Sequence, residues 1–284
     1  MAQLEPLQVG VMFWTGGELG SDTSPDEIAK YVKGLGVSCG QLGIHGSADL
    51  GPRSRQAWKD ALAAHGLTVV TVFPAFNGES YADIPTVQKT VGYIPKATRA
   101  ERERRTLESS DFAKELGIPG VATHVGFVPE DRSDADYVAV RDMVRRVCDH
   151  CAKNSQTFAL ETGQEPAVTL GEFILDVERD NLGINFDPAN MILYGSGEPI
   201  AALDIVKQWL ITVHCKDGVW PTEAGKLGTE RPLGQGDVGM DRFVAKLKEI
   251  GYQGPLVIER EITGEAQRKD ILGAIGLLER LRKA

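Results

Sequence analysis

The chain has 284 residues, 42% of them hydrophobic and 25% charged, which suits either two ordinary domains or one α/β barrel of about 250 residues with extensions. Its net charge of −9 repels a phosphate backbone and argues against nucleic acid as the main ligand. No apolar run reaches the ~18 residues that a membrane span needs, and the first residues lack a basic and an apolar signal segment, so we expect a cytoplasmic protein without a membrane partner.

Short apolar, β-branched runs alternate with helical patterns at a period of roughly 25 to 40 residues. Most of these runs stop at ionisable or Gly/Pro-rich residues, as buried strands do before a functional loop. We predict strands at residues 9–14, 38–44, 67–73, 121–125, 157–161, 182–187, 211–214 and 255–259. Helices are predicted at residues 25–34, 52–66, 99–117, 131–154, 172–179, 200–209, 240–252 and 265–281.

Two long loops interrupt this pattern. Residues 75–98 contain Gly, Pro and aromatic residues without sustained periodicity, which is typical of a lid or a binding loop. Phe76, Tyr81 and Tyr93 would suit a wall over a polar substrate, a surface excursion or contact with a partner subunit, so a homo-oligomer stays open. Residues 220–239, after the seventh strand, form the second loop.

Eight strands, each followed by a helix, are most economically closed as a single (β/α)8 TIM barrel domain that covers residues 1–284. An open doubly wound sheet would normally carry a glycine-rich nucleotide turn after its first strand, and no such motif occurs. The pair Cys148 and Cys151 lies in a helical pattern, so we interpret both as buried thiols rather than as a zinc or redox site.

Ionisable residues gather at the carboxyl ends of the predicted strands, which share one face of a barrel where function is located. They are His45, His124, Glu161, Asp187, His214 and Glu259. Side chains alternate along a strand, and apolar neighbours such as Leu160, Val213 and Ile258 can face the outer helices. The four residues that therefore converge from consecutive strands are Glu161, Asp187, His214 and Glu259. We assign His45 to substrate binding.

Three carboxylates and one imidazole at a barrel mouth would repel one another without a cation between them. This oxygen-rich set with one borderline nitrogen fits one divalent metal ion, Mn²⁺ first and Mg²⁺ next, with Co²⁺, Zn²⁺ and Fe²⁺ as alternatives. Open coordination positions would let substrate oxygens chelate the metal, and its Lewis acidity would stabilise an enolate. Each residue alone would more often be an ion-pair partner, but four in register favour a metal site.

The residues also carry a resemblance to a known family. ALETGQEP, NFDPANMILYG, VHCKDG, PLGQGDV and LVIERE resemble the xylose isomerase-like TIM-barrel superfamily, particularly its sugar phosphate isomerase/epimerase branch. These motifs lie over residues 159–261, and the strand–helix count extends the similarity along nearly the whole chain. The superfamily includes ketose epimerases, aldose–ketose isomerases, inosose and dehydroshikimate dehydratases and an abasic-site endonuclease, so the motifs are specific for fold and metal site but weak on substrate.

The resemblance implies that the four converging residues bind the metal. It further implies that Glu161 and Glu259 exchange protons with the substrate carbon from opposite faces of a cis-enediolate. His124 matches a strand-four position that often faces the site, and Arg231 matches a loop position that can reach substrate hydroxyls. The resemblance thus predicts a metal-dependent isomerase or epimerase in carbohydrate metabolism, with a small-molecule sugar as its substrate.

Three departures from the family patterns narrow the function. Asn190 stands where the endonuclease branch needs a histidine, so a trinuclear zinc cluster is disfavoured. Thr162 and Gly163 follow Glu161, which removes the lysine of the xylose isomerases and weakens a hydride shift. Lys216 directly follows the strand-seven histidine motif, as in inosose-dehydratase-like members, and can polarise a substrate oxygen, orient Asp217 or simply pair with it.

A metal-dependent lyase or dehydratase is therefore the alternative function. It would act on a keto-sugar, keto-glycoside or inosose through the same enolate, which would expel a β-leaving group instead of being reprotonated. A non-catalytic sugar-binding barrel is the third hypothesis, and the intact set of four ligands argues against it.

Overall fold

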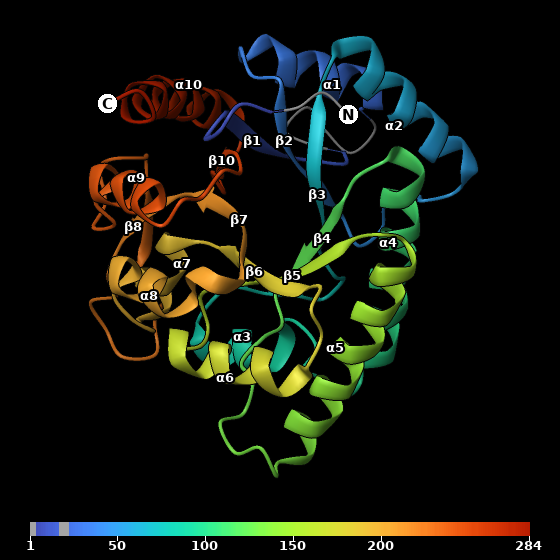
Figure 1. Ribbon diagram of the computed structural model, residues 1–284, viewed down its shortest axis with the longest axis vertical. Helices are drawn as coiled ribbons and strands as arrows, with labels where there is room; N and C mark the ends of the chain where they lie inside the picture. Colours follow the sequence, from blue (N-terminus) through green and yellow to red (C-terminus); the bar gives the residue numbers. More distant parts are fainter. Residues whose placement is uncertain (1–3, 17–22) are drawn as a thin grey trace.

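The computed structural model describes residues 4–16 and 23–284. Within them, eight parallel strands close into a barrel in the order β1-β10-β7-β6-β5-β4-β3-β2, which confirms the predicted (β/α)8 fold (Figure 1). The strands are β1 (Val9–Trp14), β2 (Cys39–Ile44), β3 (Thr68–Pro74), β4 (Gly120–Thr123), β5 (Thr157–Glu161), β6 (Leu182–Phe186), β7 (Leu210–Cys215) and β10 (Leu256–Ile258). Pairing of β1 with β10 closes the ring.

Helices surround the barrel, with α4 and α5 on one side of it and α9 and α10 on the other (Figure 1). They are α1 (Pro25–Gly34), α2 (Pro52–His65), α4 (Arg99–Leu116), α5 (Ala135–Lys153), α6 (Ala167–Val177), α8 (Pro199–Val206), α9 (Met240–Glu249) and α10 (Gly264–Leu281). A capping box begins α1, where Ser24 and Glu27 exchange side-chain and backbone hydrogen bonds. Gly66 and Gly117 end α2 and α4 in the left-handed conformation, which costs glycine little.

The alternation of side chains along the strands divides the core into two layers. Leu160, Val213 and Ile258 pack outward in the large core between barrel and helices, as predicted. A smaller apolar cluster separate from it contains Met12, Phe73, Ala122, Ala159 and Val257. Because Ala159 and Val257 have the opposite parity to Leu160 and Ile258, we place this cluster inside the barrel. It lies below the strand ends that carry the ionisable residues.

The first long loop differs from the prediction. It contains a short helix, α3 (Ile84–Thr90), whose N-terminus is capped by Asp83 accepting from Thr86 N at 2.9 Å. A helix of seven residues is too short to display a periodic pattern. Phe76 and Tyr93 do not form an open wall, because both are buried with ring centroids 5.8 Å apart. Tyr81 alone of the three aromatic residues is exposed.

Two further elements are absent from the prediction. The second long loop contains an antiparallel hairpin of β8 (Asp217–Val219) and β9 (Thr229–Arg231). A short helix, α7 (Pro188–Tyr194), follows β6 directly, and Asp187 caps it by accepting from Asn190 N at 2.9 Å. The carboxylate predicted as a metal ligand therefore also caps a helix. Its Oδ1 accepts the helix hydrogen bond, and its Oδ2 faces His214 Nδ1. The 3-10 turn η1 (Lys207–Trp209) extends α8.

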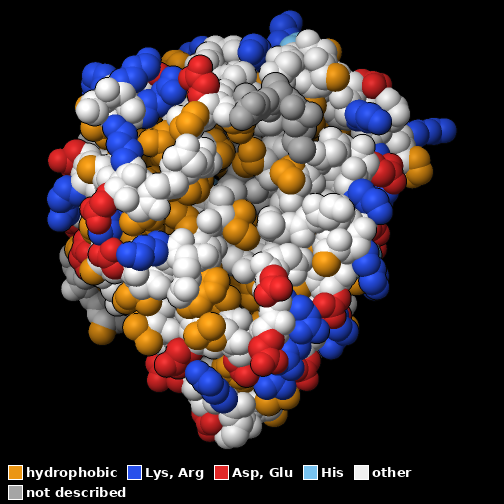
Figure 2. Space-filling view, in the orientation of Figure 1, with side chains coloured by type: hydrophobic (Ala, Val, Ile, Leu, Met, Phe, Trp, Pro, Cys, Tyr) orange, Lys and Arg blue, Asp and Glu red, His pale blue; other side chains and the backbone are white. Residues whose placement is uncertain are grey.

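The outer surface mixes charges of both signs. Acidic and basic side chains are interspersed on the face shown in Figure 2, and ion pairs such as Arg146–Glu103 join α5 to α4. Cys148 and Cys151 are buried on the inner side of α5, as expected for structural thiols. No helix among the described residues is long and apolar enough to cross a membrane.

Candidate metal centre

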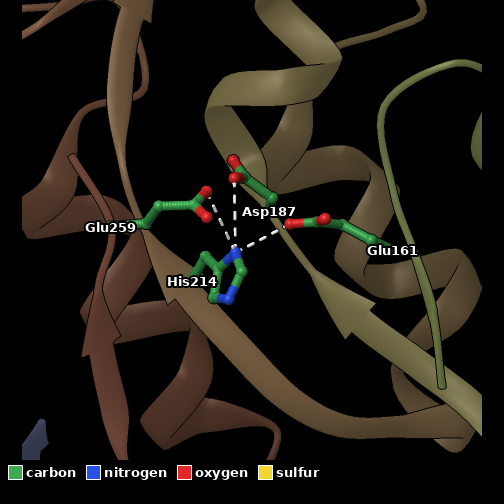
Figure 3. Close-up of side chains that lie close together, drawn as sticks. All are labelled: Glu161, Asp187, His214 and Glu259. Atoms are coloured by element: carbon green, nitrogen blue, oxygen red, sulfur yellow. Dashed lines mark ion pairs between the residues drawn. The ribbon is translucent and has the colours of Figure 1, made fainter. Parts of the chain in front are cut away.

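Four ionisable side chains, three of them buried and one partly buried, converge at the carboxyl ends of neighbouring strands. Glu161 ends β5, Asp187 follows β6, His214 lies near the end of β7 and Glu259 follows β10. Since β5, β6, β7 and β10 are consecutive in the ring, the four side chains point toward one common space (Figure 3). One ligand atom from each lies within 4.8 Å of the others, so the set can hold a metal ion. The sequence predicted this convergence.

The carboxylates face one nitrogen of the imidazole. His214 Nδ1 lies 2.7 Å from Glu161 Oε1, 3.3 Å from Glu259 Oε2 and 3.6 Å from Asp187 Oδ2 (Figure 3). Neither His214 Nδ1 nor Asp187 Oδ2 makes a hydrogen bond to any described residue. Both atoms are buried and face the same space, so they are suited to a shared cation. The donor set of three carboxylates and one imidazole fits a divalent ion.

The electrostatics agree with this interpretation. Burial alone would lower the pKa of His214, but the carboxylates of Glu259 and Glu161 raise it well above its usual range. Burial also raises the pKa of Asp187, which has the weakest compensation from neighbouring cations. In the absence of a metal, the imidazole thus binds a proton that partly offsets the three carboxylates, and a divalent cation would replace that proton.

His124 contacts the cluster, as the resemblance implied. Its Nε2 lies 2.9 Å from Glu161 Oε2, so the two oxygens of Glu161 are divided between His124 and the common space. Burial lowers the pKa of His124, but the Glu161 carboxylate outweighs it and raises the pKa to about 9. The ring lies against Phe73 and Tyr81, with centroids 5.5 and 5.8 Å away. Tyr81 therefore borders the site.

Lys216 also joins the cluster. Its side chain is only 1% exposed, and its Nζ lies 3.1 Å from Glu259 Oε2 and 2.9 Å from Glu261 Oε2. It donates to Asn190 Oδ1 at 3.2 Å. Asn190, which the resemblance aligns with the endonuclease histidine, thus binds a lysine. A buried ammonium needs such partners, and burial is outweighed here by the carboxylates of Glu259 and Glu261, which raise the pKa of Lys216.

A pair between Lys216 and Asp217 was one of three expectations, and it is wrong. Asp217 instead accepts hydrogen bonds from the backbone N–H groups of Gly218, Gly234, Gly236 and Val238. Because Asp217 is the next residue after Lys216 and side chains alternate along extended chain, the Asp217 side chain points to the opposite face. Asp217 thus organises the loop after β7.

Two predicted substrate-binding residues, His45 and Arg231, are not among the four residues of the cluster. His45 is exposed, packs on Trp14 with centroids 5.1 Å apart and lines a cavity of about 680 Å³. The described residues that line this cavity include Asp49, Arg53 and Trp58 but none of the four cluster residues. Arg231 is exposed on β9, with its backbone paired to Asp217. Both assignments remain predictions.

Gln41 and Asn185 also contact the site, although neither was predicted from the sequence as a site residue. Gln41 Oε1 lies 2.9 Å from His214 Nε2, and Asn185 Nδ2 lies 3.4 Å from Glu161 Oε1. A polar residue in the middle of an apolar strand was the available signal in each case, CGQLGI and LGINF. Glu261 was also missed as a partner of Lys216, because it follows the last strand.

Comparison with known proteins identifies close relatives. The sequence matches the xylose isomerase-like TIM barrel family over residues 29–281. The crystal structure of a xylose isomerase domain protein from Planctomyces limnophilus is 42% identical, with a TM-score of 0.90 over 98% of each chain. An uncharacterised protein of Methanocaldococcus jannaschii is 29% identical over 178 residues, which are 58% of this chain. The match spans 59% of the length of that relative.

More distant structures share the barrel. The 3-keto-D-glucoside 4-epimerase of E. coli is 16% identical, with a TM-score of 0.70, covering 96% of this chain and 99% of the epimerase chain. Other structures at this distance include further sugar epimerases and a probable dehydratase. At such identities the similarity shows the fold alone.

Proposed function

This chain belongs to the xylose isomerase-like TIM barrel family, and on that premise we propose that it is a divalent-metal-dependent sugar isomerase or epimerase. The observation that carries the proposal is the placement of Glu161 and Glu259. They come from β5 and from the end of β10, on either side of Asp187 and His214 (Figure 3). A carboxylate on each side of a bound sugar can remove a proton from one face and return it to the other.

We assign the metal to Glu161, Asp187, His214 and Glu259, with Mn²⁺ as the first candidate. When bound, the ion would supply Lewis acidity that polarises a carbonyl group and acidifies the adjacent C–H bond. Asp187 is suited to a purely holding role, because its Oδ1 is already fixed by the N–H of Asn190. His214 is fully buried and offers a single nitrogen to the common space.

The two glutamates are suited to proton transfer because each has a cationic partner on one oxygen. Glu161 Oε2 is 2.9 Å from His124 Nε2, and Glu259 Oε2 is 3.1 Å from Lys216 Nζ. These contacts orient the carboxylates and favour their ionised, proton-accepting form. His124 and Lys216, which contact the two glutamates, would also bind substrate oxygens. Tyr81 would border the substrate on the side of His124.

A lyase acting on a keto-sugar, keto-glycoside or inosose is the second candidate, and the position of Lys216 favours it. A glutamate would remove the proton from carbon, a C=C bond would form and the β-oxygen would leave with a proton. The Lys216 ammonium, which contacts Glu259, would be the proton donor for the departing oxygen.

One incubation separates the candidates. The Mn²⁺-loaded protein is incubated in D2O with ketoses, aldoses, 3-keto-glycosides and inososes, and the products are identified by NMR and mass spectrometry. An epimer or isomer carrying solvent deuterium supports the leading proposal, whereas loss of water or aglycone supports the lyase. Absence of turnover and of exchange with every substrate class would contradict both.

A further inference from the structure

We propose that Gln41 is a positioning residue that fixes the protonation pattern of His214, so that Nδ1 rather than Nε2 is available to a cation. The inference rests on the proposed metal centre, which Gln41 does not itself enter. Gln41 lies on β2, and β2 is separated from β7 in the ring by other strands on both sides. It is fully buried, and its Oε1 lies 2.9 Å from His214 Nε2.

The contact determines which imidazole nitrogen carries hydrogen. An amide oxygen can only accept, so the short contact requires an N–H at His214 Nε2. In the neutral ring the lone pair is then on Nδ1, the atom that faces Glu161, Asp187 and Glu259. Without this constraint the neutral ring could place its hydrogen on Nδ1, directed at the position that a cation would take.

A chain of hydrogen bonds fixes the orientation of the Gln41 amide. Gln41 Nε2 donates to Asn185 Oδ1 at 3.0 Å, and the Thr212 hydroxyl donates to the same oxygen. Asn185 Nδ2 in turn faces Glu161 Oε1 at 3.4 Å. Reversing the Asn185 amide would place its oxygen against a carboxylate and would force Gln41 to reverse as well. The charge of Glu161 thus fixes the orientation of the Asn185 amide, and through it that of the Gln41 amide. Gln41 in this orientation presents its oxygen to His214 Nε2.

The opposite assignment is less favourable. Asn185 Nδ2 also lies 3.3 Å from His214 Nε2 and would donate to it if Nε2 lacked hydrogen. Gln41 Oε1 and a bare Nε2 would then be two acceptors in contact at 2.9 Å. The shorter contact therefore decides for hydrogen on Nε2. A ligating histidine whose other N–H is held by a carbonyl group is the usual arrangement in metal sites.

The structure offers matched variants for the test. Gln41→Met removes the amide at similar size, whereas Gln41→Glu keeps an acceptor for His214 Nε2. Thr71→Val is the control, because Thr71 pairs with Gln41 in register, is equally buried and makes no side-chain hydrogen bond to the described residues. Mn²⁺ dissociation constants are measured by calorimetry on metal-free protein, after thermal unfolding has shown that each variant is folded.

We expect Gln41→Met to weaken Mn²⁺ binding by roughly 10- to 100-fold, Gln41→Glu to restore most of the affinity and Thr71→Val to leave it unchanged. Wild-type-like affinity of Gln41→Met would overturn the role of Gln41 while leaving the metal centre intact. Wild-type protein that binds no divalent ion would overturn the metal centre, and the inference with it.

A measurement on wild-type protein covers the case in which Gln41→Met does not fold. In ¹⁵N-labelled, Mg²⁺-loaded protein, NMR of His214 should show a slowly exchanging hydrogen on Nε2 and none on Nδ1. Hydrogen on Nδ1 in that state would contradict the proposal.

Discussion

Lys216 Nζ lies 3.1 Å from Glu259 Oε2, in a position where the lysine is almost completely removed from solvent. The ammonium also contacts Glu261 Oε2 at 2.9 Å, so one buried cation serves two carboxylates. Burial alone would raise the pKa of Glu259, but His214 and Lys216 together hold it well below its usual range. Glu259 is thereby kept ionised at the point where the proposal requires a proton acceptor.

Lys216→Met should therefore impair turnover more than metal binding. Without the ammonium, Glu259 loses both its orientation and part of its stabilisation as an anion, and we expect kcat to fall on the order of 10²-fold. Mn²⁺ affinity should be retained or increased, because a positive charge next to the ion has been removed. Steady-state kinetics and calorimetry measure the two effects. Lys207→Met, at an exposed position, is the control, and equal kcat values for the two variants would refute the role of Lys216.

Asp187→Asn should stabilise the metal-free protein and abolish its response to metal. The amide keeps an oxygen for the N–H of Asn190 while removing a buried charge whose Oδ2 has no hydrogen-bond partner in the described part of the chain. We expect a gain on the order of 1 kcal/mol in the free energy of unfolding without metal. Wild-type protein should gain about 2.7 kcal/mol at a free Mn²⁺ concentration of 100 Kd, and the variant much less.

Denaturant unfolding with chelator and with Mn²⁺ checks both parts of this prediction. Asp180→Asn, at an exposed position, is the matched control and should respond to Mn²⁺ as the wild type does. An Asp187→Asn protein that is stabilised by Mn²⁺ as strongly as the wild type would show that Asp187 is not a ligand.

Glu165 should make the stability depend on pH. It is buried, and burial raises its pKa from 4.5 to about 7, although its Oε1 accepts a hydrogen bond from Val128 N at 2.9 Å. The folded protein retains this proton up to about pH 7, whereas the unfolded chain releases it near pH 4.5. The stabilising contribution is therefore complete below pH 4.5 and is lost as pH rises through 7.

Glu165→Gln keeps the acceptor for Val128 N–H and should remove this dependence. Between pH 5 and pH 8 we expect the wild type to lose on the order of 3 kcal/mol relative to the variant. Urea unfolding at a series of pH values measures the difference, with the exposed Glu172→Gln as the control. Parallel stability curves for wild type and Glu165→Gln would mean that Glu165 does not carry a proton in the folded protein.

The sequence predicted the barrel and the four converging residues for the same physical reason. Buried parallel strands appear in the sequence as continuous apolar runs. Because side chains alternate between the two faces of a strand, each run predicts which residues face inward. Glu259 illustrates the rule beyond the end of its strand, because Glu259 N still donates to Cys215 O and continues the ladder. By alternation alone, His45 would face inward as Gln41 does. However, His45 N donates to the Thr15 hydroxyl rather than to a strand carbonyl, and the imidazole ring is exposed to solvent.

Other features required contacts that no local pattern encodes. The short helices α3 and α7 lack room for periodicity, although the aspartates that cap them were visible in the sequence. The contact of Gln41 with His214 joins residues 173 positions apart, and that of Gln41 with Asn185 joins residues 144 apart. Parity places such residues inside the barrel without stating their partners.

We propose that Glu161 and Glu259 transfer a carbon-bound proton, and hydrogen exchange with solvent measures this transfer. Mn²⁺-loaded wild type, Glu161→Gln, Glu259→Gln and the control Glu172→Gln are incubated in D2O with the best substrate of the panel, and deuterium in substrate and product is followed by NMR. We predict that each site variant binds substrate but loses at least about 10²-fold in the rate of exchange or turnover, while the control retains it. Full exchange and turnover in Glu161→Gln or in Glu259→Gln would contradict the two-glutamate account.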